Sequence, residues 1–142
     1  MIRFREARRE DVPAVVGLLA DDALGAAREG TDSAPYLAAF DAMQAEAGNI
    51  LIVGEEAGRV VATYQITFIS GLSLRASRRA PVDSVRVAAD LRGRGVGAAM
   101  MADAEARAGG GLPGDPAYLE RRAHPRARLL RTHRLYPIAH WL

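Results

Sequence analysis

The chain has 142 residues, of which 49% are hydrophobic and 25% are charged, and its net charge at pH 7 is +2. These values are ordinary for a globular chain of the commonest domain size. The absence of cysteine excludes disulfides, thiolate catalysis and Cys-based zinc sites. No apolar run approaches the roughly 18 residues of a membrane helix, and Met1–Arg5 lacks the apolar segment of a signal peptide. We therefore expect a cytoplasmic protein with no membrane partner.

The charge is unevenly distributed along the chain. Residues 1–108 hold 13 arginines against 15 acids, and residues 109–142 hold 6 arginines against 2 acids, with no lysine anywhere. We expect a single domain over 1–142, made of a core at 1–108 and a divergent C-terminal tail at 109–142. Arginines in the tail are not interleaved with aromatic platforms, and the core is slightly acidic, so no nucleic-acid partner is expected.

Hydrophobic periodicity predicts the elements of the first half. Alternation over Ile2–Glu6 predicts an edge strand. Apolar residues spaced from Val12 to Leu19, with Pro13 early, predict a helix that ends near Ala20. Residues 21–35 show little pattern, and a second amphipathic helix is expected from Tyr36 to about Ala47.

The second half begins with a hairpin. Two β-branched runs, at 49–55 and 59–68, flank a short loop that contains Gly58. A longer loop is expected at 69–80, followed by a strand that Pro81 leads into and a helix at about 96–107, whose Val96, Met100 and Ala104 share one side. This order predicts an α/β (α+β) fold with a mixed central sheet flanked by helices, not a regular βαβ alternation.

A glycine-rich turn separates the last strand from the last helix. Gly93, Gly95 and Gly97 recur at every second position, so the backbone there can approach a ligand closely. The helix that follows directs its free N–H groups at the turn, which makes an anion site. A nucleoside triphosphate loop would need a lysine, and the chain has none. The dinucleotide motif is formally matched, but a hairpin precedes it in place of a first βα unit, and the region about 20 positions on, 112–116, does not read as a strand.

The run from Arg92 to Gly97 matches the pattern R/Q-x-x-G-x-G/A after a strand that ends in Val-Arg-Val. At this point the chain resembles the GCN5-related N-acetyltransferase (GNAT) family, over residues 1 to about 108. The resemblance implies the acyl-CoA N-acyltransferase fold with an atypical C-terminal part. It also implies transfer of an acetyl group from acetyl-CoA, the expected co-substrate, to a primary amine on a small molecule or peptide.

The resemblance further implies which residues bind acetyl-CoA. The strand at Val85, Arg86 and Val87 would pair with the pantetheine arm through its backbone. The pyrophosphate would be held by the backbone N–H groups of Arg92, Gly93, Arg94, Gly95, Val96, Gly97 and Ala98. Leu91 is expected to point inward and set the turn.

Asp83 is the candidate catalytic base, because a carboxylate beside this strand can accept the proton of the amine; a surface or loop-capping role is the alternative. Tyr64 and Gln65 could line the acceptor cleft or belong to ordinary sheet packing. Glu55 and Glu56 are expected to be solvated. Three arginines could meet an acidic substrate or the 3′-phosphate of CoA, or lie in solvent: Arg75, Arg78 and Arg79.

The tail departs from the family pattern, because no clear apolar strand follows the helix. Neither Tyr118 nor Tyr136 has the context of the usual proton-donating Tyr. Read one nucleotide later with permissible codons, the tail yields Phe-Tyr-Glu-Arg-Thr-Gly-Phe at 129–135, which resembles the missing segment. We therefore hypothesise a frameshifted tail, with a native divergent tail as the alternative. A frameshifted tail would impair activity. The alternative function is a non-catalytic CoA-binding or interaction protein, and the exposed strand edge at Ser84–Val87 could form a homodimer.

Overall fold

The computed structural model describes residues 1–72, 76, 78–109 and 127–131. In chain order its elements are β1 (Arg3–Glu6), α1 (Val12–Ala20), α2 (Ala23–Arg28), α3 (Ala34–Ala45), β2 (Asn49–Glu56), β3 (Arg59–Thr67), β4 (Arg78–Val87), α5 (Val96–Ala108) and β5 (Ala127–Arg131). Short 3-10 turns precede α1 at Arg9–Asp11 and α5 at Ala89–Leu91. None of the helices in the described ranges is long and apolar enough to span a membrane.

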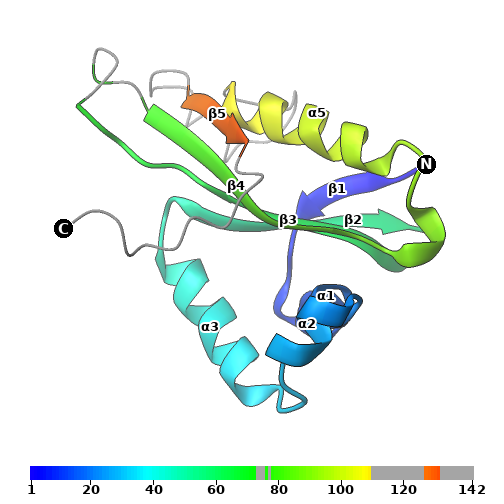
Figure 1. Ribbon diagram of the computed structural model, residues 1–142. Coiled ribbons are helices and arrows are strands. Elements are labelled where there is room, and N and C mark those ends of the chain that lie inside the picture. Colours follow the sequence, from blue (N-terminus) through cyan, green and yellow to red (C-terminus); the bar gives the residue numbers. More distant parts are fainter. Residues whose placement is uncertain (73–75, 77, 110–126, 132–142) are drawn as a thin grey trace.

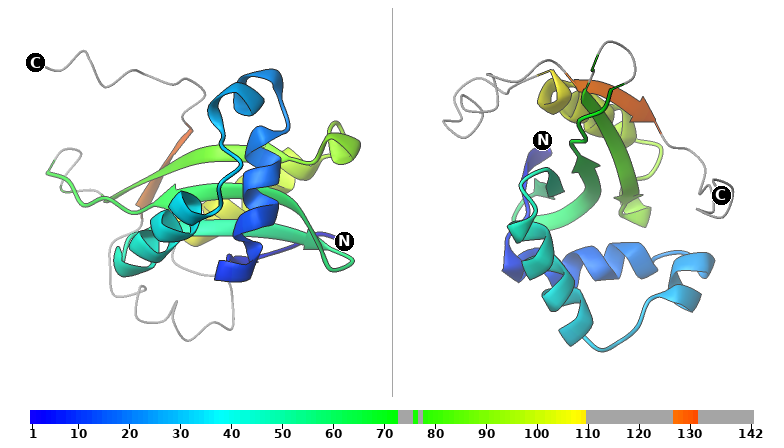
Figure 2. Two further views of the ribbon diagram at one scale, coloured as in Figure 1. Left: turned by 90° about the horizontal axis from the view of Figure 1, so that it is seen from below. Right: turned by 90° about the vertical axis from the view of Figure 1, so that its left-hand side faces the viewer.

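The strands form one sheet in the order β1-β2-β3-β4-β5. The first four strands are antiparallel to one another, and β5 runs parallel to β4. Helices α1, α2 and α3 cover one face of the sheet and α5 covers the other (Figure 1), and the two views of Figure 2 show the same layering. The mixed sheet flanked by helices, with β1 at an edge, confirms the predicted fold class.

Three elements differ from the sequence-based expectation. A short helix, α2, lies within the weakly patterned residues 21–35, where the Asp22 carboxylate caps it by accepting from the Gly25 N–H. Strand β4 begins at Arg78, inside the expected loop and ahead of Pro81. The tail contributes β5, so the prediction of no strand after the last helix is wrong. The run Ala127–Arg131 is short and has no clear strand pattern of its own. It forms a strand because it pairs with β4.

On the face covered by α5, the core is formed by large apolar side chains such as Ile52, Ile66 and Met100, each fully buried. Tyr64 is also fully buried there, and its hydroxyl donates to the Asp103 carboxylate of α5 at 2.5 Å. Arg107 donates to the same carboxylate at 2.7 Å. The Tyr64 side chain is therefore packed against α5, as in the alternative of ordinary sheet packing, on the opposite face from that of its neighbour Gln65.

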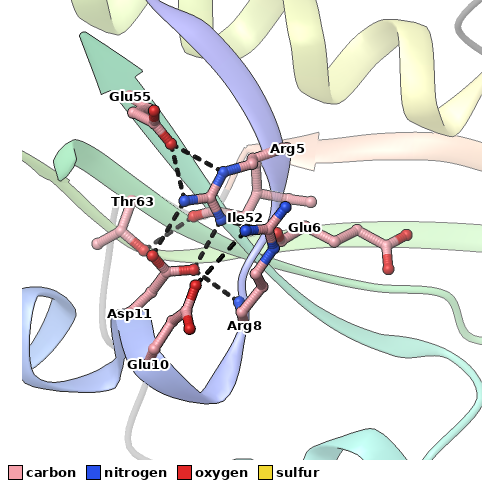
Figure 3. A network of polar contacts seen from close by, with 8 residues as sticks. All are labelled: Arg5, Glu6, Arg8, Glu10, Asp11, Ile52, Glu55 and Thr63. Carbon is pink, nitrogen blue, oxygen red and sulfur yellow. Dashed lines mark hydrogen bonds and ion pairs between the residues drawn. The ribbon is translucent and has the colours of Figure 1, made fainter. Parts of the chain in front are cut away.

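On the other face, a polar network fixes the start of α1 to the sheet (Figure 3). The Arg5 guanidinium donates to both carboxylate oxygens of Asp11, at 2.7 and 3.0 Å, and to Glu55 at 2.8 and 3.0 Å. Asp11 also accepts from the Arg8 N–H at 2.7 Å. The sequence predicted a solvated Glu55, whereas the structure pairs its carboxylate with Arg5. Arg3 is the register partner of Glu55, and the side chain of Arg5 reaches it from the same neighbouring strand, β1.

Asp11 is buried, and its hydrogen bonds from Arg5, followed by that from the Arg8 N–H, lower its pKa. A carboxylate whose pKa is lowered in the folded state stabilises the fold above its unfolded pKa of about 3.9. The stabilisation is lost as the pH falls through the lower folded value. The network thus makes the attachment of α1 dependent on an ionised Asp11.

We predict that Asp11→Asn lowers the free energy of unfolding at pH 7 by about 2 kcal/mol, since it weakens charge-assisted hydrogen bonds of a buried group. Chemical denaturation would measure this, and the gap from wild type should narrow as the pH falls below about 4. Glu10→Gln is the matched control, because Glu10 is exposed and pairs only weakly with Arg8 at 3.4 Å. Equal effects of the two substitutions at pH 7 would contradict the prediction.

Candidate functional site

Strand β4 carries a bulge where it crosses the middle of the sheet. Gln65 is opposite Asp83 and Thr63 is opposite Arg86, so β4 has one more residue than β3 between these pairs. The extra residue is accommodated by Ser84, whose φ of 52° lies in the left-handed region. Val85, the next residue, is partly exposed. The bulge turns this part of β4 out of the regular ladder.

The bulge coincides with the end of the pairing between β4 and β5. Their parallel register runs from Arg78 opposite Ala127 to Val82 opposite Arg131 and ends there. Within the described part of the chain, the half of β4 from Ser84 to Val87 has no strand on that side. Its backbone N–H and C=O groups on that side can pair with an extended ligand, as they would with an added strand.

The glycine turn joins this half-strand to α5. Gly93 and Gly95 have φ values of 76° and 82°, which a residue with a Cβ adopts only with strain. Backbone pairing across the N-terminus of α5 begins with the Ala99 N–H, which donates to the Gly95 carbonyl at 3.1 Å. The N–H groups of the first helical turn before it have no intrahelical acceptor. A Cβ built on Gly93, Gly95 or Gly97 would meet nothing within 4 Å, so this side of the turn is open. Leu91 is buried, as expected.

The side chain of Arg92 forms hydrogen bonds within the protein. Its guanidinium donates to the Val87 carbonyl at 3.1 Å and to the backbone and carboxylate of Asp21 at 3.1 and 3.0 Å. These bonds fasten the turn to the end of β4 and to the end of α1. Sequence reasoning missed Asp21, because nothing in the local pattern indicates a contact 71 residues away.

Arg86 lies beside the junction between α1 and α2, which consists of Asp21 and Asp22. One of its terminal nitrogens donates to the Val85 carbonyl at 2.9 Å, and its Nε lies 3.7 Å from the Asp22 carboxylate. This Nε is buried and has no hydrogen-bond acceptor among the described residues. The Gly25 N–H, supported by the charge of Arg86, lowers the pKa of Asp22. The junction therefore places one carboxylate beside each of two arginines, Asp21 beside Arg92 and Asp22 beside Arg86.

A cavity of about 120 Å³ lies between the sheet and the helices on the same side as the bulge. Helix α1 contributes residues from Val12 to Leu19 to its wall, and α3 contributes Phe40 and Met43. Leu51, Thr63 and Gln65 line it from the sheet, together with Ser84 of the bulge. Of the two roles that the sequence left open for Gln65, a place at a cleft and ordinary sheet packing, its position at the cavity favours the first.

Asp83 is exposed and stands opposite Gln65 in the sheet, so its side chain is on the face of the cavity. Arg79 is exposed, and its backbone pairs with Ile69 away from this site. The side chain of Arg78 and the residues Arg75, Tyr118 and Tyr136 lie outside what the structure describes. No cluster of three or more acidic or histidine side chains in the described ranges could hold a metal ion.

The half-open strand, the glycine turn and the helix N-terminus follow one another along β4 and α5. The chain matches the family model described as acetyltransferase (GNAT) family over residues 14–135. It belongs to this family, and the match continues into the tail beyond residue 108. A comparison with curated protein sequences gave no match.

Solved structures with the same fold include a protein from Bacillus halodurans C-125 described as a transcriptional regulator. It is 28% identical, with a TM-score of 0.73, over 92% of this chain and 80% of that chain. A protein from Agrobacterium tumefaciens str. C58 described as an acetyltransferase is 25% identical, with a TM-score of 0.69, over 89% and 94%. Another from Clostridium acetobutylicum, described as an acetyltransferase with acetyl-CoA, is 16% identical, with a TM-score of 0.64, over 100% and 94%.

The open side of the turn gives a test of ligand approach. We predict that Gly97→Leu weakens CoA binding by about tenfold or more, because its side chain would occupy the space beside the free N–H groups. The melting temperature should not fall, since Leu is a better helix former than Gly and a Cβ meets nothing in the protein. Isothermal titration with CoA and a thermal melt provide the two readouts.

Gly97→Ala is the matched control, because the motif allows Ala at this position. Its CoA affinity should stay within about threefold of wild type, as expected for a change that adds one methyl group. Full CoA affinity in Gly97→Leu would show that the ligand does not approach this side of the turn.

Proposed function

We propose that the protein is an N-acetyltransferase that transfers the acetyl group of acetyl-CoA to a primary amine. The observation that carries the proposal is the continuity of three features: the free half of β4, the turn with its open side, and the N-terminus of α5. Together they offer a strand edge for an extended chain and a cluster of N–H donors for a doubly charged group. Family membership and the related structures support the same reading.

The residues present fit acetyl-CoA. The N–H groups of Gly93, Gly95 and the first turn of α5 would hold the pyrophosphate, whereas those of Arg92 and Arg94 already donate to the carbonyls of Ala89 and Leu91 at 3.3 and 3.4 Å. The backbone of Val85–Val87 would hold the pantetheine arm. Side chains need not supply the charge, because the helix dipole and the backbone donors do. A Cβ at Gly93, Gly95 or Gly97 would meet nothing within 4 Å, so the backbone there is open to such a group. Acetyl-CoA supplies the acetyl group as an activated thioester.

In the proposed reaction the amine nitrogen forms a bond to the thioester carbonyl carbon, the carbon–sulfur bond breaks, and the thiolate leaves. The amine must lose a proton, and Asp83 is the proposed acceptor of it, directly or through one water. Asp83 suits this role because it is exposed on the face of the cavity, beside the bulge that the thioester would reach. The exposed position gives the proton a route to solvent.

We predict that Asp83→Asn lowers kcat/KM for acetyl transfer by about 100-fold at pH 7, as expected for the loss of a general base. The deficit should shrink as the pH is raised, since the amine then enters deprotonated. Steady-state assays with thiol detection, run with several primary amines, would measure this. Asp90→Asn is the matched control: Asp90 is exposed near the same turn and pairs with Arg59 at 2.7 Å, so its loss should change kcat/KM less than about threefold.

Binding of acetyl-CoA should be unaffected by either substitution. Acetyl-CoA binding by the wild type without turnover of any amine would instead indicate a non-catalytic CoA-binding protein. Absence of acetyl-CoA binding would refute both functions.

A further inference from the structure

The cavity beside the bulge has a chemical character that selects among amines. Apart from Thr63, Gln65, Ser84 and Tyr36, all of its lining residues are apolar, and none of them is charged. Three of the four polar groups already have partners: the Thr63 hydroxyl donates to Ile52 O at 2.9 Å, and the Gln65 amide donates to Asn49 at 2.7 Å. The Tyr36 hydroxyl bonds to Glu29 and to the Gly30 N–H. A charged group buried here would therefore lose its hydration without compensation.

A cross-strand row gives the cavity a direction. Leu51 of β2 is opposite Gln65 of β3, which is opposite Asp83 of β4, so the three side chains form one line across the sheet on the same face. Leu51 and Gln65 line the cavity, and the Asp83 carboxylate stands at the end of the row. Neighbouring strands are about 4.8 Å apart, so the row spans roughly 10 Å from an apolar end to an anionic end.

We infer that the acceptor is a primary amine on a compact uncharged apolar group, of the size of a phenyl ring or a branched alkyl chain. The amine would lie at the Asp83 end and the apolar group in the cavity, toward Leu51 and the helices. This inference rests on the proposed function and goes beyond it by naming the class of acceptor. The cavity of about 120 Å³ is comparable to apolar protein cavities of about 150 Å³ that accept benzene.

The apolar group of the amine fits the cavity better than a long acyl chain of the co-substrate does. The pantetheine arm is expected along the free edge of β4, on the far side of that strand from β3. The cavity runs the other way, beneath β3 and as far as β2. A two-carbon acetyl group at the bulge would leave most of it to the acceptor.

The test compares amines and two matched variants of α3. Ala39 is exposed at the rim and lines the cavity, whereas its neighbour Ala38 is exposed and does not line it. Ala39→Phe should fill the cavity, and Ala38→Phe, which adds the same side chain to the same helix, should not. Wild type should acetylate benzylamine and 3-methylbutylamine with a kcat/KM about tenfold or more above that for ethanolamine and spermidine. Ala39→Phe should abolish this preference by raising KM for benzylamine, and Ala38→Phe should retain it.

Direct binding gives a readout that does not need turnover. Saturation-transfer NMR should detect the ring protons of benzylamine bound to wild type and to Ala38→Phe, with little signal for Ala39→Phe. Met43→Ala, which enlarges the cavity from the other turn of α3, should shift the preference toward 1-naphthylmethylamine and keeps the test valid if Ala39→Phe does not fold.

Three results would overturn the inference. One is a preference for spermidine or ethanolamine with no detectable binding of benzylamine; acetyl transfer itself would then still stand. Another is an Ala39→Phe protein that changes the choice among acetyl-, propionyl- and isovaleryl-CoA and leaves the choice of amine unchanged. The third is equal NMR signals from Ala38→Phe and Ala39→Phe. If no acetyl transfer occurs with any amine, the proposed function fails, and benzylamine binding alone decides the character of the cavity.

Discussion

The candidate site depends on the change in pairing along β4. Its first half, from Arg78 to Val82, pairs with β5 and meets β3 only at Val82, with one isolated bridge from Arg79 to Ile69, whereas its second half is paired to β3. The bulge at Ser84 falls where the two halves meet. A bulge inserts a residue without breaking the strand, so the chain keeps its place in the sheet and still turns an edge outward. Without the second half free, the glycine turn would bind an anion with no adjacent place for the rest of the molecule.

The position of α1 links the sheet to this edge. At its start, Arg5 of β1 binds Asp11 and Glu55, which holds the helix against the sheet. At its end, Asp21 binds Arg92, which holds the glycine turn. One helix therefore connects the N-terminal edge strand to the candidate cofactor site and forms one wall of the cavity between them. A change in the tilt of α1 would alter both the turn and the cavity, because the packed interior transmits small shifts.

Sequence reasoning succeeded where the signal is local. The glycine spacing at 93–97, the apolar face of α5 and the turn at Gly58 each reside in a few consecutive residues, and the structure places them as expected. It failed where a distant partner decides the outcome. Tyr64 and Gln65 look alike as cleft residues, and only the register with β2 and β4 assigns Gln65 to the cavity and Tyr64 to α5. Strand β5 and the Asp21–Arg92 contact depend on partners far along the chain, so their own residues do not reveal them.

This difference also explains why the co-substrate is easier to infer than the acceptor. The proposed cofactor half of the site consists of backbone atoms, a helix dipole and glycines, so a short motif carries nearly all of its information. The acceptor half uses side chains from α1, α3 and three strands, which meet only in the folded protein. Apolar walls discriminate by size and burial, at about 25 cal/mol per Å² of apolar surface. The proposed class of amine therefore follows from the packing between the helices and the sheet, while the proposed acetyl donor follows from the turn.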